Sequence, residues 1–324
     1  MIQTKTGGDK MMTQFVGIPT RYRSEDRLDP AIGLDLTVQR KWNIPDKVVI
    51  KAAVVGAPIK RAMNPNHPYT PDEIRREAME CIDAGAISIH IHPRTDEGNV
   101  PSDKDEYIRR LHLIIDPIKK KYGDRVIVDG CTLLRTLEDE TELIKSGLVE
   151  ISPVNAFWAS PRKLMQAEAQ VMQENGVKPE IAIYCDGDLD RANRWLIEPG
   201  IITKPLYWLL LPSYGIGGTP MANEFAMAES LIWQVRQIRQ IDPESVIMVC
   251  MAGRASSYLT TMAMLLGLHV RVGMEDTCFK WPHKDDRIGS NAEVVGQTMT
   301  IAKLLGRRPA TANEYRALIG LPTR

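Results

Sequence analysis

The stretch Ala86-Ile-Ser-Ile-His-Ile-His-Pro-Arg94 follows Gly85 and has the alternating pattern of a β-strand. The alternation places the three isoleucines on one face and Ser88, His90 and His92 on the other. The two histidines then share a face, with Cα atoms roughly 6.5–7 Å apart. That separation allows both imidazoles to bind one metal ion, so the stretch predicts a strand that supplies two ligands of a metal site.

Seven other runs rich in Val and Ile have the composition of strands, and longer amphipathic patterns separate them. In Thr70-Pro-Asp-Glu73, threonine is a favourable helix cap, proline suits the first helical position and acidic residues favour the first turn. The expected strands cover 47–56, 86–92, 125–130, 148–154, 180–185, 205–212, 246–252 and 269–275. Helices are expected to begin at Thr70, Ser102, Thr136, Ser160 and Thr311, and to cover about 188–198, 222–241, 255–267 and 290–306.

This regular alternation places the chain in the α/β class, because strands that are each followed by a helix form a parallel sheet. Eight such units favour a closed (β/α)8 TIM barrel over an open, doubly wound sheet. The open sheet would require a glycine-rich fingerprint in its first turn, and Gly56-Ala-Pro-Ile-Lys-Arg61 is not one. We expect a TIM-barrel catalytic domain over residues 47–324.

Residues 1–46 are polar, mixed in charge and poorly periodic, and we interpret them as an N-terminal extension. Two interpretations stay open for this arm. It is either a partly disordered leader or a segment that wraps a neighbouring subunit.

The composition of the 324-residue chain excludes several classes of protein. Lysine plus arginine and aspartate plus glutamate number 41 each, so no net charge favours nucleic acid or an anionic membrane. No apolar run approaches the ~20 residues of a membrane span. The five cysteines are scattered and form no C-x-x-C pair, which favours reduced thiols in a cytoplasmic protein.

The last expected strand, His269-Val-Arg-Val-Gly-Met-Glu-Asp276, offers a third metal ligand. Its alternation points Arg271 and Glu275 into the barrel, near His90 and His92. Two histidines and one carboxylate leave an open coordination position, as in catalytic zinc sites, and non-haem iron(II) uses the same ligands. The alternative is a polar barrel interior satisfied by hydrogen bonds alone.

Arg271 lies one inward step below Glu275 and needs a carboxylate partner when buried. Asp276 is the candidate, either in a structural ion pair or in a charged dyad whose aspartate is a base. Four weaker candidates for substrate contacts lie at the ends of other strands: Cys131, Thr132, Asn155 and Asp186.

The sequence also resembles the β-keto acid cleavage enzymes, long catalogued as a domain of unknown function, from about Lys47 to Leu321. The most specific features are the His90-Ile-His92 strand and Gly267-Leu-His-Val-Arg-Val-Gly-Met-Glu-Asp276. Further similar stretches are Ala53-Val-Val-Gly-Ala, Asn64-Pro-Asn-His-Pro-Tyr-Thr-Pro-Asp-Glu-Ile, Pro179-Glu-Ile, Ser290-Asn-Ala-Glu-Val-Val, Leu304-Leu-Gly-Arg, Ala310-Thr-Ala and Leu318-Ile-Gly-Leu.

The resemblance implies a zinc-dependent TIM-barrel transferase that converts a β-keto acid and acetyl-CoA into acetoacetate and a new acyl-CoA, through a metal-stabilised enolate. By motif position, His90, His92 and Glu275 would bind zinc, in preference to iron(II) or another divalent metal. Arg271 and Asp276 would form the dyad that promotes deprotonation. The resemblance also suggests a homo-oligomer, with a tetramer as the expected form.

The resemblance places Pro58 in the substrate pocket. In the amino-keto acid member of the family, a glutamate at this position grips the substrate's ammonium group, so this chain lacks that means of recognising a cation. Two other functions stay open from the sequence. One is a metal-dependent aldolase or lyase that uses no CoA, and the other is a non-catalytic metal-binding barrel.

Overall fold

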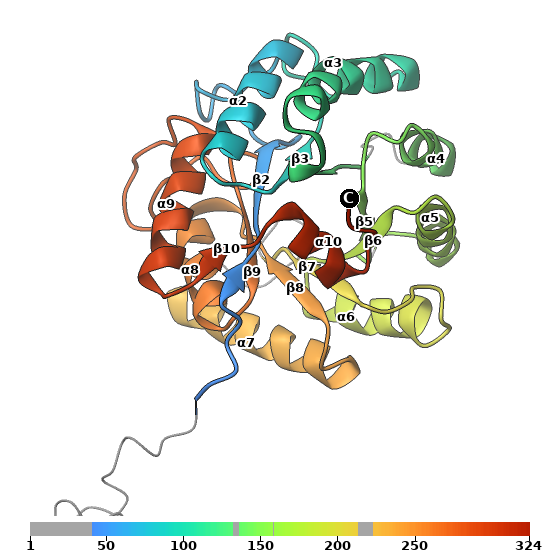
Figure 1. The fold of residues 1–324 in the computed structure, drawn as a ribbon, viewed down its shortest axis with the longest axis vertical. Helices are drawn as coiled ribbons and strands as arrows, with labels where there is room; N and C mark the ends of the chain where they lie inside the picture. The colour runs from blue at the N-terminus through green and yellow to red at the C-terminus, as the bar shows by residue number, and fades with distance from the viewer. Residues whose placement is uncertain (1–40, 132–135, 158, 213–222) are drawn as a thin grey trace, which may run out of the picture. The chain divides into compact units, whose positions relative to one another are not determined.

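The expected barrel is present in the computed structural model, which describes residues 41–131, 136–157, 159–212 and 223–324 (Figure 1). Eight parallel strands pair in chain order, and the last pairs with the first, so the sheet is closed. The strands are β2 (Ile50–Val55), β3 (Ser88–Ile91), β4 (Ile127–Asp129), β5 (Ile151–Asn155), β6 (Lys178–Ile183), β7 (Tyr207–Leu210), β8 (Val246–Val249) and β9 (His269–Val272).

Helices lie between successive strands and cover the outside of the barrel (Figure 1). They are α2 (Pro71–Asp83), α3 (Lys104–Tyr122), α4 (Leu137–Lys145), α5 (Arg162–Glu174), α6 (Asp186–Ala192), α7 (Glu224–Ile241), α8 (Ser256–Leu265) and α9 (Asn291–Leu304). A further helix, α10 (Ala312–Ile319), follows the last strand. Short turns occupy η4 (Gly123–Arg125), η5 (Asn193–Ile197) and η6 (Gly253–Ala255).

The helix starts predicted at Thr70, Thr136 and Thr311 are confirmed by their capping hydrogen bonds. Thr70, Thr136 and Thr311 each accept a hydrogen bond from the backbone three residues further on. The cap of α3 is Asp103 rather than Ser102, because the Asp103 carboxylate accepts from Glu106 N. At α5 the cap is Pro161, which has no side-chain acceptor.

The first predicted strand is divided into two. Its beginning, β1 (Lys47–Val48), pairs with β10 (Arg308–Pro309) outside the barrel sheet, and only β2 enters the barrel. Between them the amide of Val49 donates to Nδ1 of His269, at 3.1 Å, instead of to a backbone carbonyl. The side chain of His269 thus replaces a backbone acceptor at Val49, and the continuous strand that the Val-rich sequence predicts is interrupted there.

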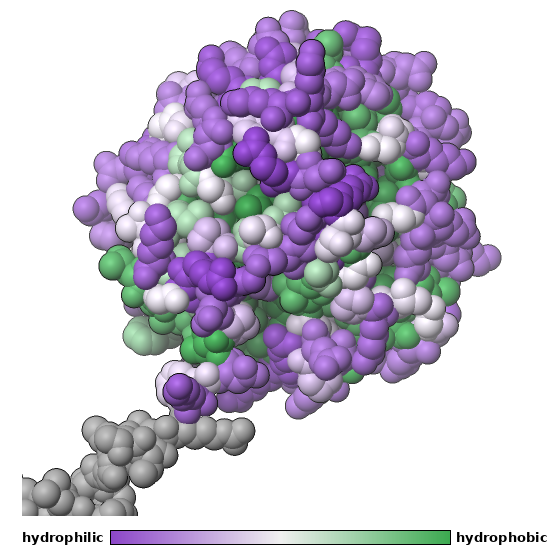
Figure 2. All heavy atoms as spheres, in the orientation of Figure 1, coloured by the Kyte–Doolittle hydropathy of each residue, from purple (hydrophilic) through white to green (hydrophobic). Residues whose placement is uncertain are grey.

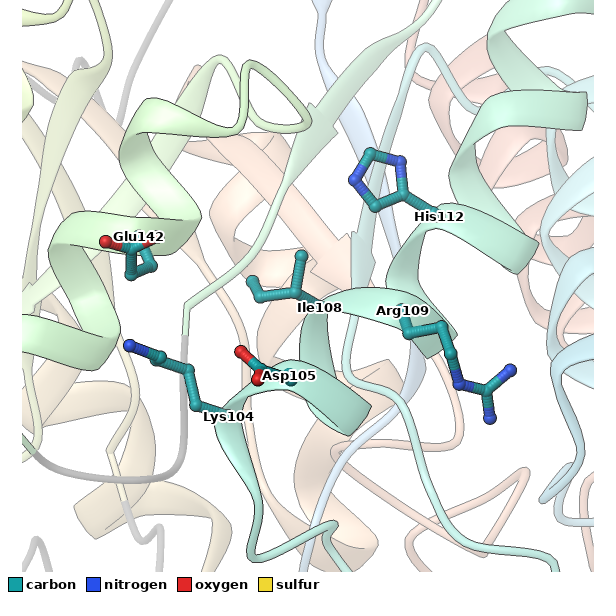
Figure 3. A pocket seen from close by; sticks show the side chains of 6 residues that line it. All are labelled: Lys104, Asp105, Ile108, Arg109, His112 and Glu142. Atoms are coloured by element: carbon teal, nitrogen blue, oxygen red, sulfur yellow. The ribbon is translucent and has the colours of Figure 1, made fainter.

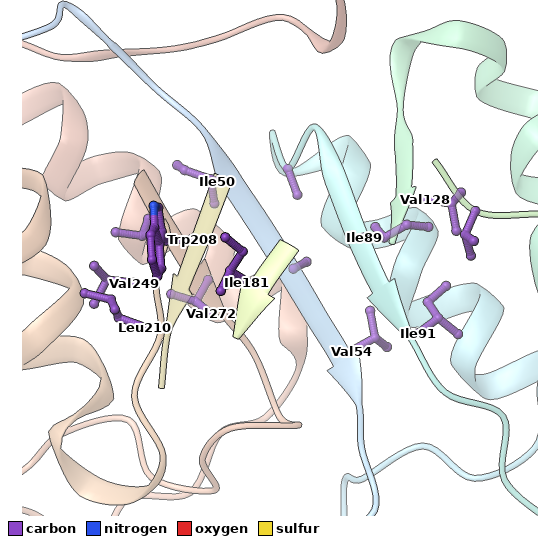
Figure 4. Close-up of a cluster of buried hydrophobic side chains, with 14 of the residues drawn as sticks. Ile50, Val54, Ile89, Ile91, Val128, Ile181, Trp208, Leu210, Val249 and Val272 are labelled. Atoms are coloured by element: carbon purple, nitrogen blue, oxygen red, sulfur yellow. The ribbon is translucent and has the colours of Figure 1, made fainter. Parts of the chain in front are cut away.

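The buried apolar side chains form two clusters, one on each side of the barrel sheet. The outer cluster packs the strands against the helices and includes Ile89, Ile91 and Trp208 (Figure 4). The inner cluster fills the barrel with residues such as Tyr207 and Met248. One detail of the predicted alternation is wrong, because Ile87 precedes β3 and packs against the inner cluster.

The amino-terminal end of the barrel is closed by α10 (Figure 1). The Tyr315 hydroxyl is hydrogen-bonded to that of Tyr207 on the barrel interior. Arg316 pairs with Glu150, just before β5, at 2.8 Å. The same face is covered mainly by hydrophilic residues, with apolar ones between them (Figure 2). Among the described residues, the cavity that leads to the barrel interior opens at the carboxyl ends of the strands, which we call the mouth.

Gly273 turns the chain sharply after β9. Its φ is +149°, and a Cβ atom there would lie 2.1 Å from the carbonyl oxygen of Ala53. Glu275 N then donates to the same Ala53 oxygen, at 3.1 Å. Only glycine permits this approach, so Gly273 fixes the direction in which Glu275 leaves β9.

None of the described helices is both long and apolar enough to cross a membrane. Residues 1–40 lie outside the described part of the chain. The N-terminal extension and its boundary with the catalytic domain therefore stay a prediction.

Substituting Gly273→Ala should lower the free energy of unfolding by about 2–4 kcal/mol, because the new Cβ meets a backbone carbonyl and φ is unfavourable. The matched control is Gly296→Ala within α9, where a Cβ meets nothing within 4 Å and helix propensity should add up to ~1 kcal/mol. Denaturant titration measures both. Equal stability of the two variants would contradict the constraint at Gly273.

Candidate metal centre and active site

His90 and His92 lie at the carboxyl end of β3 and face the barrel interior, where both side chains are almost fully buried. Their Nε2 atoms are 2.9 Å apart. Alternation along the strand brings the rings together, as the sequence predicted.

Glu275 reaches the same point from the turn after β9. Its carboxylate oxygens lie 3.5 Å from Nε2 of His90 and 3.8 Å from Nε2 of His92. Space for this side chain depends on Gly56, since a Cβ there would lie 2.2 Å from Cγ of Glu275. The structure therefore brings all three predicted ligands together.

The three side chains fit a metal ion. Nitrogen and oxygen ligands arranged tetrahedrally about one zinc lie about 3.3 Å apart. The two imidazole Nε2 atoms, 2.9 Å apart, and the pair Nε2 of His90 and Oε2 of Glu275, 3.5 Å apart, bracket this value. Oε2 of Glu275 is buried with no hydrogen-bond partner among the described residues. An uncompensated buried oxygen is costly, and a cation would satisfy it.

The protonation states also suit a metal. Burial lowers the pKa of both His90 and His92, which favours the neutral form that binds metals. Burial alone would raise the pKa of Glu275, but the guanidinium of Arg271, which donates to its carboxylate, keeps that pKa below its usual value. The site thus presents two neutral imidazoles and one carboxylate.

Arg271 and Asp276 form the predicted ion pair beside this group. Nη2 of Arg271 donates to Oδ1 of Asp276 and to Oε1 of Glu275, both at 2.7 Å. Nε of Arg271 also donates to Asp276, at 3.2 Å. Burial, with help from Glu275, raises the pKa of Asp276 to about 6 although Arg271 opposes the change. Asp276 is therefore a more basic carboxylate than an exposed aspartate.

Sequence reasoning missed two partners of the histidines. Nδ1 of His92 lies 3.1 Å from the hydroxyl of Tyr107, which donates to the carbonyl of Cys131 at 2.9 Å. Nδ1 of His90 lies 3.2 Å from Oδ2 of Asp129. The sequence did contain an indication of Asp129. It is an acidic residue in an otherwise apolar strand, at a position of β4 whose side chain points into the barrel.

A cavity of about 460 Å³ opens from the metal ligands toward the mouth. Three of the predicted substrate contacts, Pro58, Cys131 and Asn155, line it. Its other lining side chains are mainly apolar or aromatic, among them Phe157, Leu164, Ala182, Tyr184, Leu209 and Leu211. Such a wall suits the carbon skeleton of a small organic acid.

The other two predicted contacts are not found in this cavity. Asp186 begins α6 and lines a different hollow, and its Oδ1 accepts from Gln234 of α7 at 3.0 Å. The start of α6 thus directs Asp186 toward a neighbouring helix. Thr132 lies outside the described residues.

Two glutamates that the sequence did not single out line the cavity at α4 and α5. Glu140 accepts from the hydroxyl of Ser152 at 2.8 Å. Burial, reinforced by the charge of Glu140, raises the pKa of Glu168 to about 7. One wall of the cavity is therefore acidic, and its charge depends on pH near neutrality.

A separate hollow lies on the outside of the barrel between α3 and α4 (Figure 3). It is lined by Lys104, Asp105, Ile108, Arg109, His112 and Glu142. Within the described ranges, only His90, His92 and Glu275 have the spacing of a metal site. The outer hollow therefore offers no second metal centre.

A closed α/β barrel with two buried histidines and a carboxylate at its mouth has the arrangement of a metal-dependent enzyme. The family model for beta-keto acid cleavage enzymes matches residues 47–321. The chain belongs to this family, which confirms the resemblance seen in the motifs and identifies an enzyme that cleaves carbon–carbon bonds.

Two curated relatives align along most of the chain. The 3-keto-5-aminohexanoate cleavage enzyme of Acetoanaerobium sticklandii is 31% identical over 288 residues, covering 85% of this chain and 99% of the relative. The 3-oxoadipate:acetyl-CoA acetyltransferase of Cupriavidus necator is 25% identical over 287 residues, covering 85% and 95%. Among solved structures, apo ObcA has a TM-score of 0.62 at 19% identity, covering 79% of this chain and 66% of that one, which supports the fold.

Substituting Gly56→Ala should weaken the binding of an added divalent metal, with zinc as the probe, by about 10-fold or more, because the added Cβ displaces the carboxylate of Glu275. Competition with a chromophoric chelator measures the affinity. In the control Gly187→Ala, a Cβ meets only the guanidinium of Arg191, at 3.8 Å, and the affinity should not change. Native affinity in Gly56→Ala would exclude Glu275 as a ligand.

Proposed function

We propose that this chain is a zinc-dependent transferase that cleaves a β-keto acid with acetyl-CoA. The products are acetoacetate and the acyl-CoA of the remaining part of the keto acid. The observation that carries the proposal is that three metal ligands and the Arg271–Asp276 pair share one buried mouth in a member of this family. The acetyl-CoA acetyltransferase among the relatives supports the choice of co-substrate.

His90, His92 and Glu275 would hold the ion. When bound, zinc would act as a Lewis acid on the ketone of the substrate. It would thereby lower the pKa of the C–H group next to that ketone. The two neutral histidines keep the metal site from carrying excess negative charge, since only Glu275 contributes a carboxylate.

Asp276 is the proposed base. It removes a proton from the carbon between the ketone and the carboxylate of the substrate. Arg271 holds both oxygens of Asp276 through its Nε and Nη2 atoms, which aims the carboxylate and keeps it buried. The guanidinium also lies where negative charge develops as the proton leaves, and so stabilises that charge.

The remaining steps form one carbon–carbon bond and break another, and they need no redox cofactor. The deprotonated carbon attacks the acetyl carbonyl of acetyl-CoA, a carbon–carbon bond forms, and CoA leaves as a thiolate. The thiolate attacks the original ketone, the older carbon–carbon bond breaks, and acetoacetate departs after taking a proton. Leu209, Leu211 and Ala182 line the cavity with apolar surface, which limits hydrolysis of the intermediates.

We further propose a cytoplasmic homo-oligomer. All five cysteines are unpaired, which is consistent with a reducing compartment. Phe225 and Trp233 on α7 and Leu304 on α9 expose large apolar side chains, which supports association between subunits.

The zinc-loaded protein should convert acetyl-CoA into acetoacetate and a new acyl-CoA only when a suitable β-keto acid is present. A panel of keto acids with neutral, cationic and anionic side chains, followed by chromatographic separation of acetyl-CoA from the acyl-CoA product, makes the measurement. Acetoacetate should appear in equal amount to the thioester product, measured by mass spectrometry. Cleavage of a keto acid without any need for acetyl-CoA would instead identify the aldolase or lyase.

Substituting Asp276→Asn should lower kcat by about 100-fold or more while KM changes little, because the base is lost and the shape of the side chain is kept. Asp242→Asn is the matched control, since Asp242 is buried and paired with Lys204 before β8, away from the mouth. An Asp276→Asn protein with native kcat would exclude Asp276 as the base.

A further inference from the structure

A buried lysine lies inside the barrel below the metal centre. Lys51 of β2 is fully buried and forms ion pairs with Asp129 of β4 and Glu180 of β6. Its Nζ lies 2.6 Å from Oε1 of Glu180, and it also donates to Oδ2 of Asp129. A buried ammonium is unfavourable without such partners, so this group constrains three strands at once.

Asp129 connects this lysine to a metal ligand. It is the register partner of His90 across the β3–β4 pair, and its Oδ2 atom lies 3.2 Å from Nδ1 of His90. The contact is close, but the ring is not aligned for a hydrogen bond, and both Nδ1 of His90 and Oδ1 of Asp129 lack partners among the described residues. In the described part of the chain, the buried Nδ1 of His90 thus has no partner within reach other than the carboxylate of Asp129, and that carboxylate has a free lone pair to accept its proton.

We propose that Asp129 is a positioning residue, which accepts the Nδ1 proton of His90 and thereby directs the lone pair of Nε2 toward the metal. The inference rests on the proposed function in that it requires a metal to be bound there. Ligand histidines commonly donate their other ring N–H to a carboxylate or carbonyl, which fixes the tautomer and raises the basicity of the ligand.

The neighbouring histidine shows the same orientation with a different acceptor. The hydroxyl of Tyr107 directs its hydrogen to the carbonyl of Cys131, so its oxygen accepts from Nδ1 of His92. Both rings then carry the proton on Nδ1 and leave Nε2 free on the side of Glu275. The carboxylate at His90 is the stronger acceptor of the two, so His90 gains more from its partner.

Lys51 holds Asp129 in place beside His90. Burial disfavours the ammonium, but the two carboxylates outweigh it and raise the pKa of Lys51. The ion pair of Lys51 with Oδ2 fixes the position of the Asp129 carboxylate in the barrel. Lys51 therefore acts on the metal ligand through Asp129, two steps from the reacting atoms.

The zinc affinity of Asp129→Asn, measured by chelator competition, should be about 10- to 100-fold weaker than native. Glu180→Gln is the matched control: it removes the same charge from the same lysine without touching His90, and should stay within about threefold of native. Thermal melts establish that both variants are folded. With cobalt(II) in place of zinc, only Asp129→Asn should change the visible absorption spectrum.

The outcomes separate the two proposals. If the native protein binds no stoichiometric zinc, the proposed function fails. If it does bind zinc but Asp129→Asn binds equally well, or both variants weaken equally, the positioning role is overturned. Should Asp129→Asn not fold, nitrogen NMR of histidine-labelled, metal-free native protein reports the tautomer. A proton on Nδ1 of His90 supports the inference, and one on Nε2 overturns it.

Discussion

The ammonium of Lys51 balances charge in a barrel whose interior cannot be reached by bulk water from its closed end. Around it and the metal ligands, the four carboxylates of Asp129, Glu180, Glu275 and Asp276 face two cations, Lys51 and Arg271. The carboxylates outnumber the cations in this buried group, so the group attracts a further cation. The charges around the site and the geometry of the ligands thus favour the same occupant.

Two glycines give this charged group its shape. Gly273 lets the chain turn against the carbonyl of Ala53, and Gly56 leaves room for the side chain of Glu275. Both lie beside β2 and β9, which are paired where the barrel closes. The position of the third metal ligand is therefore determined by backbone constraints at the closure of the sheet, and the ion itself is not needed to explain it.

The sequence predicted those features that depend on local period. Alternation placed His90 and His92 on one inward face, and eight repeats of strand and helix predicted the closed barrel. Alternation also predicted that Glu275 points inward, but β9 ends at Val272 and the turn at Gly273 is what directs Glu275 to the histidines. Ion pairs between side chains of different strands could not be predicted, because the stagger between the strands decides which inward side chains meet. The ion pair of Lys51 with Asp129 is one of them. Asp186 was placed by its position after a strand, but the first turn of α6 directs it toward Gln234.

The closed end of the barrel has a practical consequence for handling the protein. Arg324 lies beside Glu150 and Asn313, at the end sealed by α10 and opposite the mouth. A purification tag, a fluorescent label or a surface linker joined after Arg324 would therefore leave the opening unobstructed. Attachment through this end of the barrel would keep the linker away from the entrance of the subunit that carries it, so that reactants and products exchange freely there.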